Sequence, residues 1–599
     1  MLEQNRLWLQ ASNQKMMDAY RKQPDREPCA EYGDLRFFDM SHEGKLGICD
    51  EDYVTPKFYE RQNENLKSLD KKKPLEGEKR FVIVSGTDGG LLLNHVVSNN
   101  LIKHLVIIEE DVESFSHSLQ VTDWPALFKD FEERGGTVFF NIGPMTLNVK
   151  QRLYNHFNDI GPHNASTIHV DLDNGKMSGP NVKTIVSCLQ DVINSLGFFD
   201  DERVGLAHTV DKLTNRARFL ERPRAPWIEK PAMVCGNGSS LEKALPQIRK
   251  HREKMILIAC GSTIGTFYRN DITPDFYIEQ ERPKVTSNVT KVTTTPEFRK
   301  NVTAITLNVT HPQTDGMFRE TVHVLKSNDL GAMVAKKFLP DHHVAMFVNP
   351  LVANCGLSVA IHLGFKEIYL AGVDCAFSAD GASHAKGVDE RYTRELPENA
   401  VPIKGNLRET VHTIPLFFDS LKSLSLAIRN APKGAKFYNM SDGGYVVGAK
   451  PTKKFIPKHT PKISIDEILE PFTPPVHIPH RDELRRSFLS MFSKLRGKID
   501  SIPNRISGRD EAFFYIDEVY SELQTLKEYA RQFWTMVKGT FSTHLVFLHG
   551  CAERDLDAFD RSSTIFKDLA QAVHLKLKED FYLPSMWEGT ERLPKNVND

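Results

Sequence analysis

A glycine-rich loop at residues 236–240 has the clearest potential for chemistry in this chain. It follows the apolar run PAMVC (231–235) and precedes the amphipathic stretch LEKALPQIRKH (241–251). Glycine lets a backbone approach a ligand closely, and a helix N-terminus offers unpaired N–H groups to an anion. The pattern therefore predicts a phosphate or nucleotide site, with Ser239 and Glu242 as a capping box that fixes the start of the helix. The candidate binding residues are Gly236, Asn237, Gly238, Ser239 and Ser240.

A second loop, at residues 261–263, follows the apolar run MILIAC (255–260). Doubly wound parallel sheets bind ligands at the carboxyl ends of their strands, near a switch point in the strand order. Polar residues also end other predicted strands, and we expect them at the same rim. The candidates are Gly261, Ser262, Thr263, Glu279, Asn308, Asn349 and Asp374, with Asn354 as a further binding residue. For Asp374 an equal alternative is a structural cap that accepts backbone N–H bonds.

Two histidines have the chemistry of an acid or a base. His384 lies in the glycine-containing loop CAFSADGASHAKG (375–387), and His412 lies where the last helix of this region is predicted, at about 410–430. An imidazole titrates near working pH, so it suits proton transfer or donation to a leaving phosphate. For both residues the alternative is an exposed loop histidine without a chemical role.

No metal-ligand spacing is found in the sequence. His342 and His343 are adjacent and would point apart on a strand, and the eight cysteines form no CxxC pair. We therefore predict no metal ligands. Dispersed cysteines in apolar runs are typical of a reduced, cytoplasmic protein. The N-terminal residues do not form a secretory signal, and no run approaches about 18 apolar residues, so we expect no membrane span.

Composition sets the remaining bounds. The 599 residues include 77 Lys and Arg and 78 Asp and Glu, for a net charge of −1. A charge this close to zero excludes a general basic field for nucleic acid. A hydrophobic content of 40% is that of an ordinary globular chain.

The order of elements predicts the fold class α/β, with two Rossmann-like doubly wound α/β domains followed by a C-terminal helical domain. Strands alternate with helices from about Phe81 and again from about Pro231, whereas only helical periodicity follows a proline-rich stretch. The predicted parts are a mainly helical arm (1–75), a Rossmann-like domain (76–225), a second α/β domain (226–450), a Pro-rich linker (451–480) and a helical domain (481–599).

The first α/β domain has a weaker candidate site of its own. A glycine turn at residues 86–90 follows its first strand, and Glu109 or Glu110 falls where a ribose-binding acid would lie. The turn matches the dinucleotide fingerprint imperfectly. We favour a scaffold without a ligand.

Several ordered motifs resemble the motility accessory factor family of bacterial flagellin glycosyltransferases. They are the run from 231 to 280, GFKEIYLAGVDCAF (364–377), GASHAKG (381–387) and FYNMSDGG (437–444). Residues 236–240 and 363–374 are also similar to bacterial sialyltransferases that use CMP-sialic acid, so the resemblance implies a sialyltransferase-like catalytic domain at 226–450. The sequence departs from the sialyltransferases at Ser239, where they have proline, and at Ala376 and Phe377, where they have a phosphate-binding tyrosine.

The resemblance implies a donor, an acceptor and a mechanism. The donor is a CMP-activated nonulosonic acid, pseudaminic or legionaminic acid, and the acceptors are Ser and Thr hydroxyls of flagellin in the bacterial cytoplasm. The phosphate would lie over the glycine loop, Asn237 would hold the ribose or phosphate, and His384 would stabilise the departing CMP. The candidate bases, in falling order, are His412, Glu279 and Asp374. No cofactor is expected to be required, and a divalent metal ion is left open.

Two alternatives remain at this level. One is a non-catalytic protein that binds flagellin or assists its export, which is expected to leave flagellin unmodified. The other is a 6-hydroxymethylpterin diphosphokinase-like enzyme that uses ATP, since a related branch of the same domain has that chemistry. The large flanking regions disfavour the diphosphokinase-like enzyme. Neither the oligomeric state nor the choice between the two sugars is predicted.

Overall fold

The computed structural model describes residues 78–578, with gaps at 111–114, 116–117, 120, 144–146, 167, 173–177, 195, 222–226, 379–380, 386–395, 398–399 and 457–461, and also residues 4, 5 and 7. The predicted helical arm (1–75) therefore lies almost wholly outside the described residues. The chain forms two compact units. Unit 1 comprises Met1–Phe198, Ser493–Tyr529 and Val537–Ala572, and unit 2 comprises Phe199–Phe492, Ala530–Met536 and Val573–Asp599.

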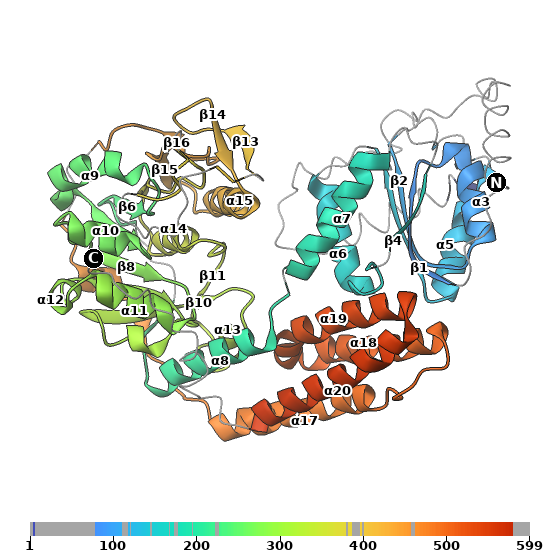
Figure 1. Cartoon of the computed structure of the whole chain (residues 1–599). Coiled ribbons are helices and arrows are strands. Elements are labelled where there is room, and N and C mark those ends of the chain that lie inside the picture. Colours follow the sequence, from blue (N-terminus) through green and yellow to red (C-terminus); the bar gives the residue numbers. More distant parts are fainter. Residues whose placement is uncertain are drawn as a thin grey trace. The chain divides into compact units, whose positions relative to one another are not determined.

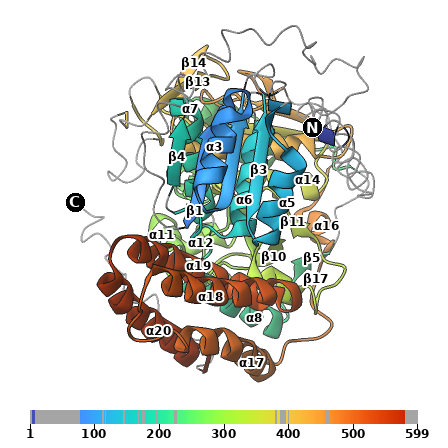
Figure 2. The ribbon, with the colours of Figure 1, turned by 90° about the vertical axis from the view of Figure 1, so that its right-hand side faces the viewer.

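Unit 1 contains a four-stranded parallel sheet in the order β3-β2-β1-β4. Its strands are β1 (Lys79–Ser85), β2 (Ile102–Glu109), β3 (Thr137–Ile142) and β4 (Ile168–Leu172). β1 is buried along its whole length, as expected for a parallel strand covered on both faces. Helices α3 (Leu91–Asn99) and α5 (Trp124–Glu133) cover one face, and α6 (Leu147–Ile160) and α7 (Ser178–Asn194) cover the other (Figure 1). Figure 2 shows α3 and α5 on the near face.

Long helices follow in the C-terminal region, namely α17 (Arg481–Asp500), α18 (Arg509–Tyr529), α19 (Arg531–Arg554) and α20 (Leu556–Lys578). Much of this region belongs to unit 1 and packs against its sheet. The buried Arg80 of β1 and Lys103 of β2 donate to the Asp517 carboxylate of α18, at 2.9 and 2.6 Å. The guanidinium of Arg80 also lies over the Phe513 ring, 4.3 Å from its centroid. Charge pairing and stacking thus join the helices to the sheet.

Unit 2 is built on one long sheet in the order β16-β15-β12-β6-β7-β8-β9-β10-β5-β17. Its central strands are β6 (Ala232–Cys235), β7 (Ile256–Cys260), β8 (Phe276–Glu279), β9 (Thr303–Leu307), β10 (Glu320–Lys326), β12 (Glu367–Ala371) and β15 (Lys436–Asn439), and all of them pair in parallel. The other strands are short: β5 (Phe219–Leu220), β11 (Val344–Ala345, beside β10), β16 (Lys450–Pro451) and β17 (Phe472–Thr473).

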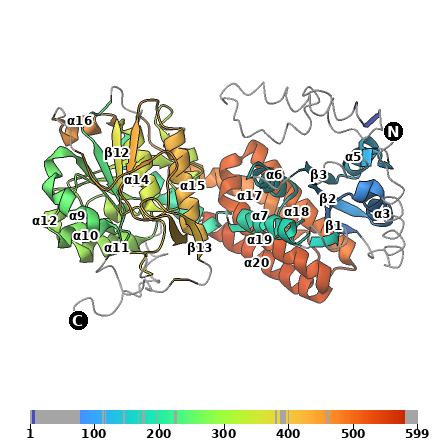
Figure 3. The ribbon, with the colours of Figure 1, turned by 90° about the horizontal axis from the view of Figure 1, so that it is seen from above.

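Helices cover both faces of this sheet. α9 (Leu241–Lys250) and α10 (Thr263–Arg269) pack on one face, and α14 (Val352–His362) and α15 (Pro415–Arg429) pack on the other, as Figure 3 shows from above. The chain runs from β6 outward to β7, and from β12 outward in the opposite direction to β15. The strand order therefore reverses between β6 and β12, and the carboxyl ends of these two strands form the switch point.

The predicted fold class is confirmed, with one difference in detail. The helix predicted from about 410 begins at Pro415. Its first residues instead form strand β14 (Thr410–Thr413), which pairs with β13 (Val401–Lys404) in a hairpin. Among the described residues, no helix has both the length and the apolar character needed to cross a membrane.

Candidate functional site

The glycine loop after β6 lies directly against the loop after β12. The N–H of Gly236 donates to the carbonyl of Ala371 (3.0 Å), and the N–H of Gly238 donates to that of Gly372 (2.8 Å). A Cβ atom on Gly238 would lie 2.6 Å from the Asp374 carboxyl group and 2.7 Å from the Gly372 oxygen. The glycines are therefore required for the close approach of two protein loops at the switch point.

The N-terminus of α9 is occupied by an acid from this chain. The Asp374 carboxylate accepts from the N–H of Ser240 (2.9 Å) and the hydroxyl of Ser239 (3.2 Å), and the Ser240 hydroxyl also donates to it. Burial raises the pKa of Asp374, while these three hydrogen bonds oppose the rise. Asp374 thus has the structural capping role that the sequence analysis gave as the alternative to a catalytic role. The predicted capping box of Ser239 and Glu242 is wrong, because the helix is capped at Ser240, without a bond from that side chain to the helix backbone.

Asn237 connects three loops of the site. Its side-chain amide donates to the Ser262 hydroxyl (3.0 Å) and accepts from that of Thr266 (2.9 Å), both in or beside α10. Its backbone carbonyl accepts from the N–H of Ala385 (2.9 Å). The loop after β6 is thereby tied to the loop after β7 and to the loop that carries His384.

His384 is held next to the glycine loop by the Ala385 bond. The imidazole is half-buried, and its Nδ1 is hydrogen-bonded to the Ser383 hydroxyl at 2.9 Å. Burial lowers the pKa of His384, so the ring is neutral at pH 7. Ser262 is exposed beside Asn237, whereas Thr263 is buried and donates to the carbonyl of Cys235 (3.2 Å). Gly261 has a left-handed φ of 52°, which its position in this turn requires. The structure therefore brings together residues 236–240, 261–263, 374 and 384.

Two of the proposed bases, His412 and Glu279, differ in their surroundings. His412 is exposed on β14, with its carbonyl oxygen accepting from the N–H of Phe377 (2.9 Å). The Glu279 carboxylate is buried and accepts from the Tyr277 hydroxyl (2.6 Å) and from two backbone N–H groups that follow it. Burial raises the pKa of Glu279. This set of partners gives Glu279 a structural role at the end of β8.

The three predicted asparagine ligands other than Asn237 do not converge on the glycine loop. Asn308 is fully buried, and its amide bonds Thr209, Asp329 and the backbone of Lys326, because helix α8 (Phe199–Thr214) covers the ends of β9 and β10. Asn354 is buried and joins α14 to Ser420 of α15. Asn349 is exposed in the loop after β11. The expectation that every polar strand end faces one open rim is therefore corrected.

An ion cluster that the sequence analysis missed lies at the same loops. The Asp442 carboxylate, which follows β15, accepts two bonds from Arg408 (3.0 and 2.7 Å) and one from Lys243 in the first turn of α9 (2.6 Å). Burial alone would raise the pKa of Asp442, but these partners lower it below its ordinary value. Asp442 lay inside the motif FYNMSDGG, whereas nothing in the sequence marked Arg408. The cluster places two cations and one anion beside the helix N-terminus.

The candidate acid of unit 1 has a structural role. In unit 1, Glu109 accepts from the N–H and the hydroxyl of Thr87 (2.6 and 2.8 Å), so this acid holds its own glycine turn. Within the described part of the chain, no group of three or more His, Cys, Asp or Glu side chains is arranged to hold a metal ion.

Comparisons with known proteins match two parts of the chain to two different family models. Residues 10–170 match the model of the glycosyltransferase Maf N-terminal domain, and residues 206–380 match the 6-hydroxymethylpterin diphosphokinase MptE-like model. A solved Maf glycosyltransferase structure from Magnetospirillum magneticum AMB-1 has the same fold, with a TM-score of 0.67 at 17% identity over 89% of this chain and 85% of that chain. The chain is therefore similar to motility accessory factor (Maf) proteins, in residues 10–170 by sequence and over most of its length by fold. A search of curated proteins finds no match. The sialyltransferase likeness stays a prediction.

Proposed function

We propose that this chain is a glycosyltransferase that moves a nonulosonic acid from a CMP-activated donor to Ser or Thr hydroxyls of flagellin in the bacterial cytoplasm. The match of residues 10–170 to the N-terminal domain of a glycosyltransferase family supports the reaction class. The observation that carries the proposal is the meeting of the glycine loop, Asn237 and His384 at the switch point of unit 2. Ligands of doubly wound sheets bind at such a point.

The occupied helix N-terminus changes how the donor would bind. Because Asp374 already accepts from Ser240, the donor phosphate is expected on the outer side of the loop. There Ser262 and His384 present polar groups, Asn237 positions Ser262, and Lys243 adds an ammonium group whose side chain is 69% exposed. Fixed donors and a cation at the point where charge develops would stabilise the departing CMP.

His384 has the state that this role needs. Its neutral ring carries one N–H and one lone pair at pH 7, so it can donate to the leaving phosphate or accept a proton from the acceptor hydroxyl. Asp374 and Glu279 are buried and engaged, which makes His384 the better candidate for proton transfer. His412 stays a weaker candidate because its ring is exposed on the hairpin.

Mass spectrometry of flagellin co-expressed with the donor pathway tests the proposal. We expect His384→Ala and Asn237→Ala to lower glycan occupancy at least about 100-fold, the usual size of a lost acid–base or positioning group. His477→Ala, which removes an exposed imidazole of the same unit, is the matched control and should leave occupancy unchanged. Full occupancy in both site variants would contradict the assignment.

A pterin diphosphokinase is the second candidate, because the MptE-like model covers the whole glycine-loop region. It predicts that the unmodified protein binds ATP and a pterin, whereas the first proposal predicts binding of CMP. Calorimetric titration of the full chain with each nucleotide separates the two. Tight ATP binding without CMP binding would favour the kinase.

A further inference from the structure

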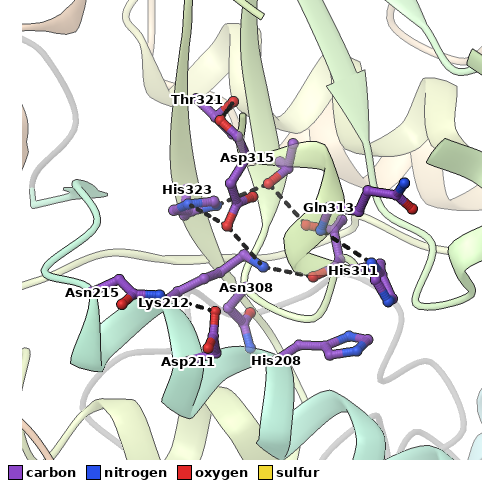
Figure 4. Close-up of polar contacts among 12 residues, drawn as sticks. His208, Asp211, Lys212, Asn215, Asn308, His311, Gln313, Asp315, Thr321 and His323 are labelled. Carbon is purple, nitrogen blue, oxygen red and sulfur yellow. Dashed lines mark hydrogen bonds and ion pairs between the residues drawn. The ribbon is translucent and has the colours of Figure 1, made fainter. Parts of the chain in front are cut away.

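A buried lysine organises the loop that follows β9. Lys212 of α8 is fully buried, and its ammonium group donates to the carbonyl of Thr310 (2.6 Å) and lies 3.6 Å from the Asp315 carboxylate (Figure 4). The loop continues into a short 3-10 helix, η5 (Pro312–Thr314). Because an unpaired buried ammonium is costly, Lys212 is held by these oxygens and fixes the loop against α8.

Two imidazoles at this loop, those of His208 and His311, each have an Nδ1 atom hydrogen-bonded to the backbone. The backbone partner determines whether that nitrogen carries the proton. His208 Nδ1 lies 2.8 Å from the carbonyl oxygen of Val309, which can only accept, so Nδ1 carries the proton and Nε2 has a lone pair. His311 Nδ1 lies 3.0 Å from the N–H of Gln313, which can only donate, so Nδ1 accepts and Nε2 carries the proton. The two rings therefore present opposite groups.

The rings are neighbours, and both are half-buried. Their centroids are 5.1 Å apart with an interplanar angle of 74°, and Figure 4 shows them side by side, with Lys212 between them and His323. Burial and Lys212 lower the pKa of His208 to about 3, with smaller effects of His311 and Arg282, while its bond to Val309 opposes the shift. Burial and three lysines, Lys212, Lys284 and Lys291, lower that of His311 to about 4. Both rings are therefore neutral from about pH 5 upward.

A neutral donor beside a neutral acceptor matches one class of ligand. A metal ion needs a lone pair on each imidazole, which His311 does not offer at Nε2. A peptide group offers an N–H and a C=O close together, which is the complement of this pair. We propose that His208 and His311 form a subsite for the polypeptide backbone of the acceptor protein. This proposal rests on the proposed transfer to a protein.

The position of the pair agrees with an acceptor rather than a donor subsite. It lies at the end of β9, three strands from β6 and its glycine loop in the sheet order. Neighbouring strands are about 4.8 Å apart, so the two sites are separated by about 14 Å, which about four residues of extended chain would span. The pair would therefore hold acceptor residues about four positions from the modified hydroxyl.

Transfer kinetics with unglycosylated flagellin and the CMP-activated sugar test the proposal. We expect His208→Ala and His311→Ala each to raise the KM for flagellin about tenfold, as for the loss of one hydrogen bond, and the double variant to raise it further. The KM for the donor and the rate of donor hydrolysis should not change. His477→Ala is the control for loss of a histidine from the unit surface, and thermal unfolding checks that each variant is folded.

The outcomes separate this proposal from the proposed function. An unchanged KM for flagellin in both variants would overturn the subsite, and a raised KM for the donor alone would assign the pair to the donor instead. If the unaltered protein neither transfers nor hydrolyses the donor, the proposed function itself fails. Nitrogen-15 NMR of the imidazoles provides an independent test, since we expect Nδ1–H on His208 and Nε2–H on His311 at pH 7. The reverse pattern would contradict the argument without any enzyme assay.

Discussion

At the scale of single residues, the switch point of unit 2 is organised by Asp374. Its carboxylate receives three hydrogen bonds from Ser239 and Ser240, which lie about 134 positions earlier in the chain. The sequence located the glycine loop and its place between strand and helix. The sequence also predicted a capping box, a motif in which the helix start is paired with a residue three positions away. The observed partner is instead Asp374, which follows another strand. Local spacing carries no information about such a distant acid.

The close approach at Gly238 leads to a prediction about stability. We expect Gly238→Ala to lower the free energy of unfolding by about 1–3 kcal/mol, because its Cβ would lie 2.7 Å from the backbone oxygen of Gly372 and the loops must separate. Gly316→Ala in the same unit is the control, since nothing lies within 4 Å of its Cβ position. Urea denaturation measures both. Equal midpoints for the two variants would show that the switch-point loops yield without cost.

At the scale of elements, helix α8 explains why a polar residue at a strand end was wrongly predicted as a ligand. Asn308 follows β9 as predicted, but the helix from Phe199 to Thr214 covers that end and pairs the asparagine with Thr209. The helix lies within the range predicted for the preceding domain, so nothing in the local pattern assigned it to this sheet. The strands themselves were readable because buried parallel strands are continuous apolar runs.

The junction of α18 with the unit 1 sheet predicts a loss of stability in acid. His163 and His549 lie together there, and burial lowers the pKa of both, with Asp517 offsetting only part of the effect. The folded state then binds fewer protons than the unfolded chain, so this stabilisation is complete above about pH 6.5 and decreases as the pH falls below it. Burial alone would raise the pKa of the Asp517 carboxyl, but His163, Arg80 and Lys103 lower it, which adds a further loss below about pH 4.

Thermal unfolding between pH 8 and pH 5 tests this expectation. His549→Phe keeps the ring stacked on Phe513 but removes the titrating group, so its loss of stability between pH 7 and pH 5 should be smaller than that of the unaltered chain. His477→Phe, at an exposed site of unit 2, should follow the unaltered chain. The same pH dependence in all three proteins would place the titration elsewhere.

At the scale of the whole molecule, the units are not consecutive segments. Unit 1 combines the sheet before Phe198 with the helical residues Ser493–Tyr529 and Val537–Ala572, and most of unit 2 lies between them in the sequence. The helical periodicity of the C-terminal region could be read from the sequence, because its apolar positions repeat at helical spacing. Its partner could not, since Arg80 and Asp517 are 437 residues apart and nothing local links them.

A chain that ends at residue 480 should reveal this dependence. Without α18, Arg80 of β1 loses Asp517 and Phe513 and is left as a charge without those partners. We expect amide hydrogens of Lys79–Ser85 to exchange at least about 100-fold faster than in the full chain, while those of Ile256–Cys260 in unit 2 stay slow. Equal protection of Lys79–Ser85 in both chains would show that the sheet of unit 1 is stable by itself.

The insertion of unit 2 also has a consequence for synthesis of the protein. The sheet of unit 1 leaves the ribosome first, but the helices that pair with Arg80 and Lys103 are translated roughly 300 residues later, about 15–60 s at bacterial and eukaryotic elongation rates. Unit 2 has all its central strands by Asn439 and can fold in that interval. During this interval the helix-binding face of nascent unit 1 stays exposed. We therefore expect chaperones to bind this part of the chain.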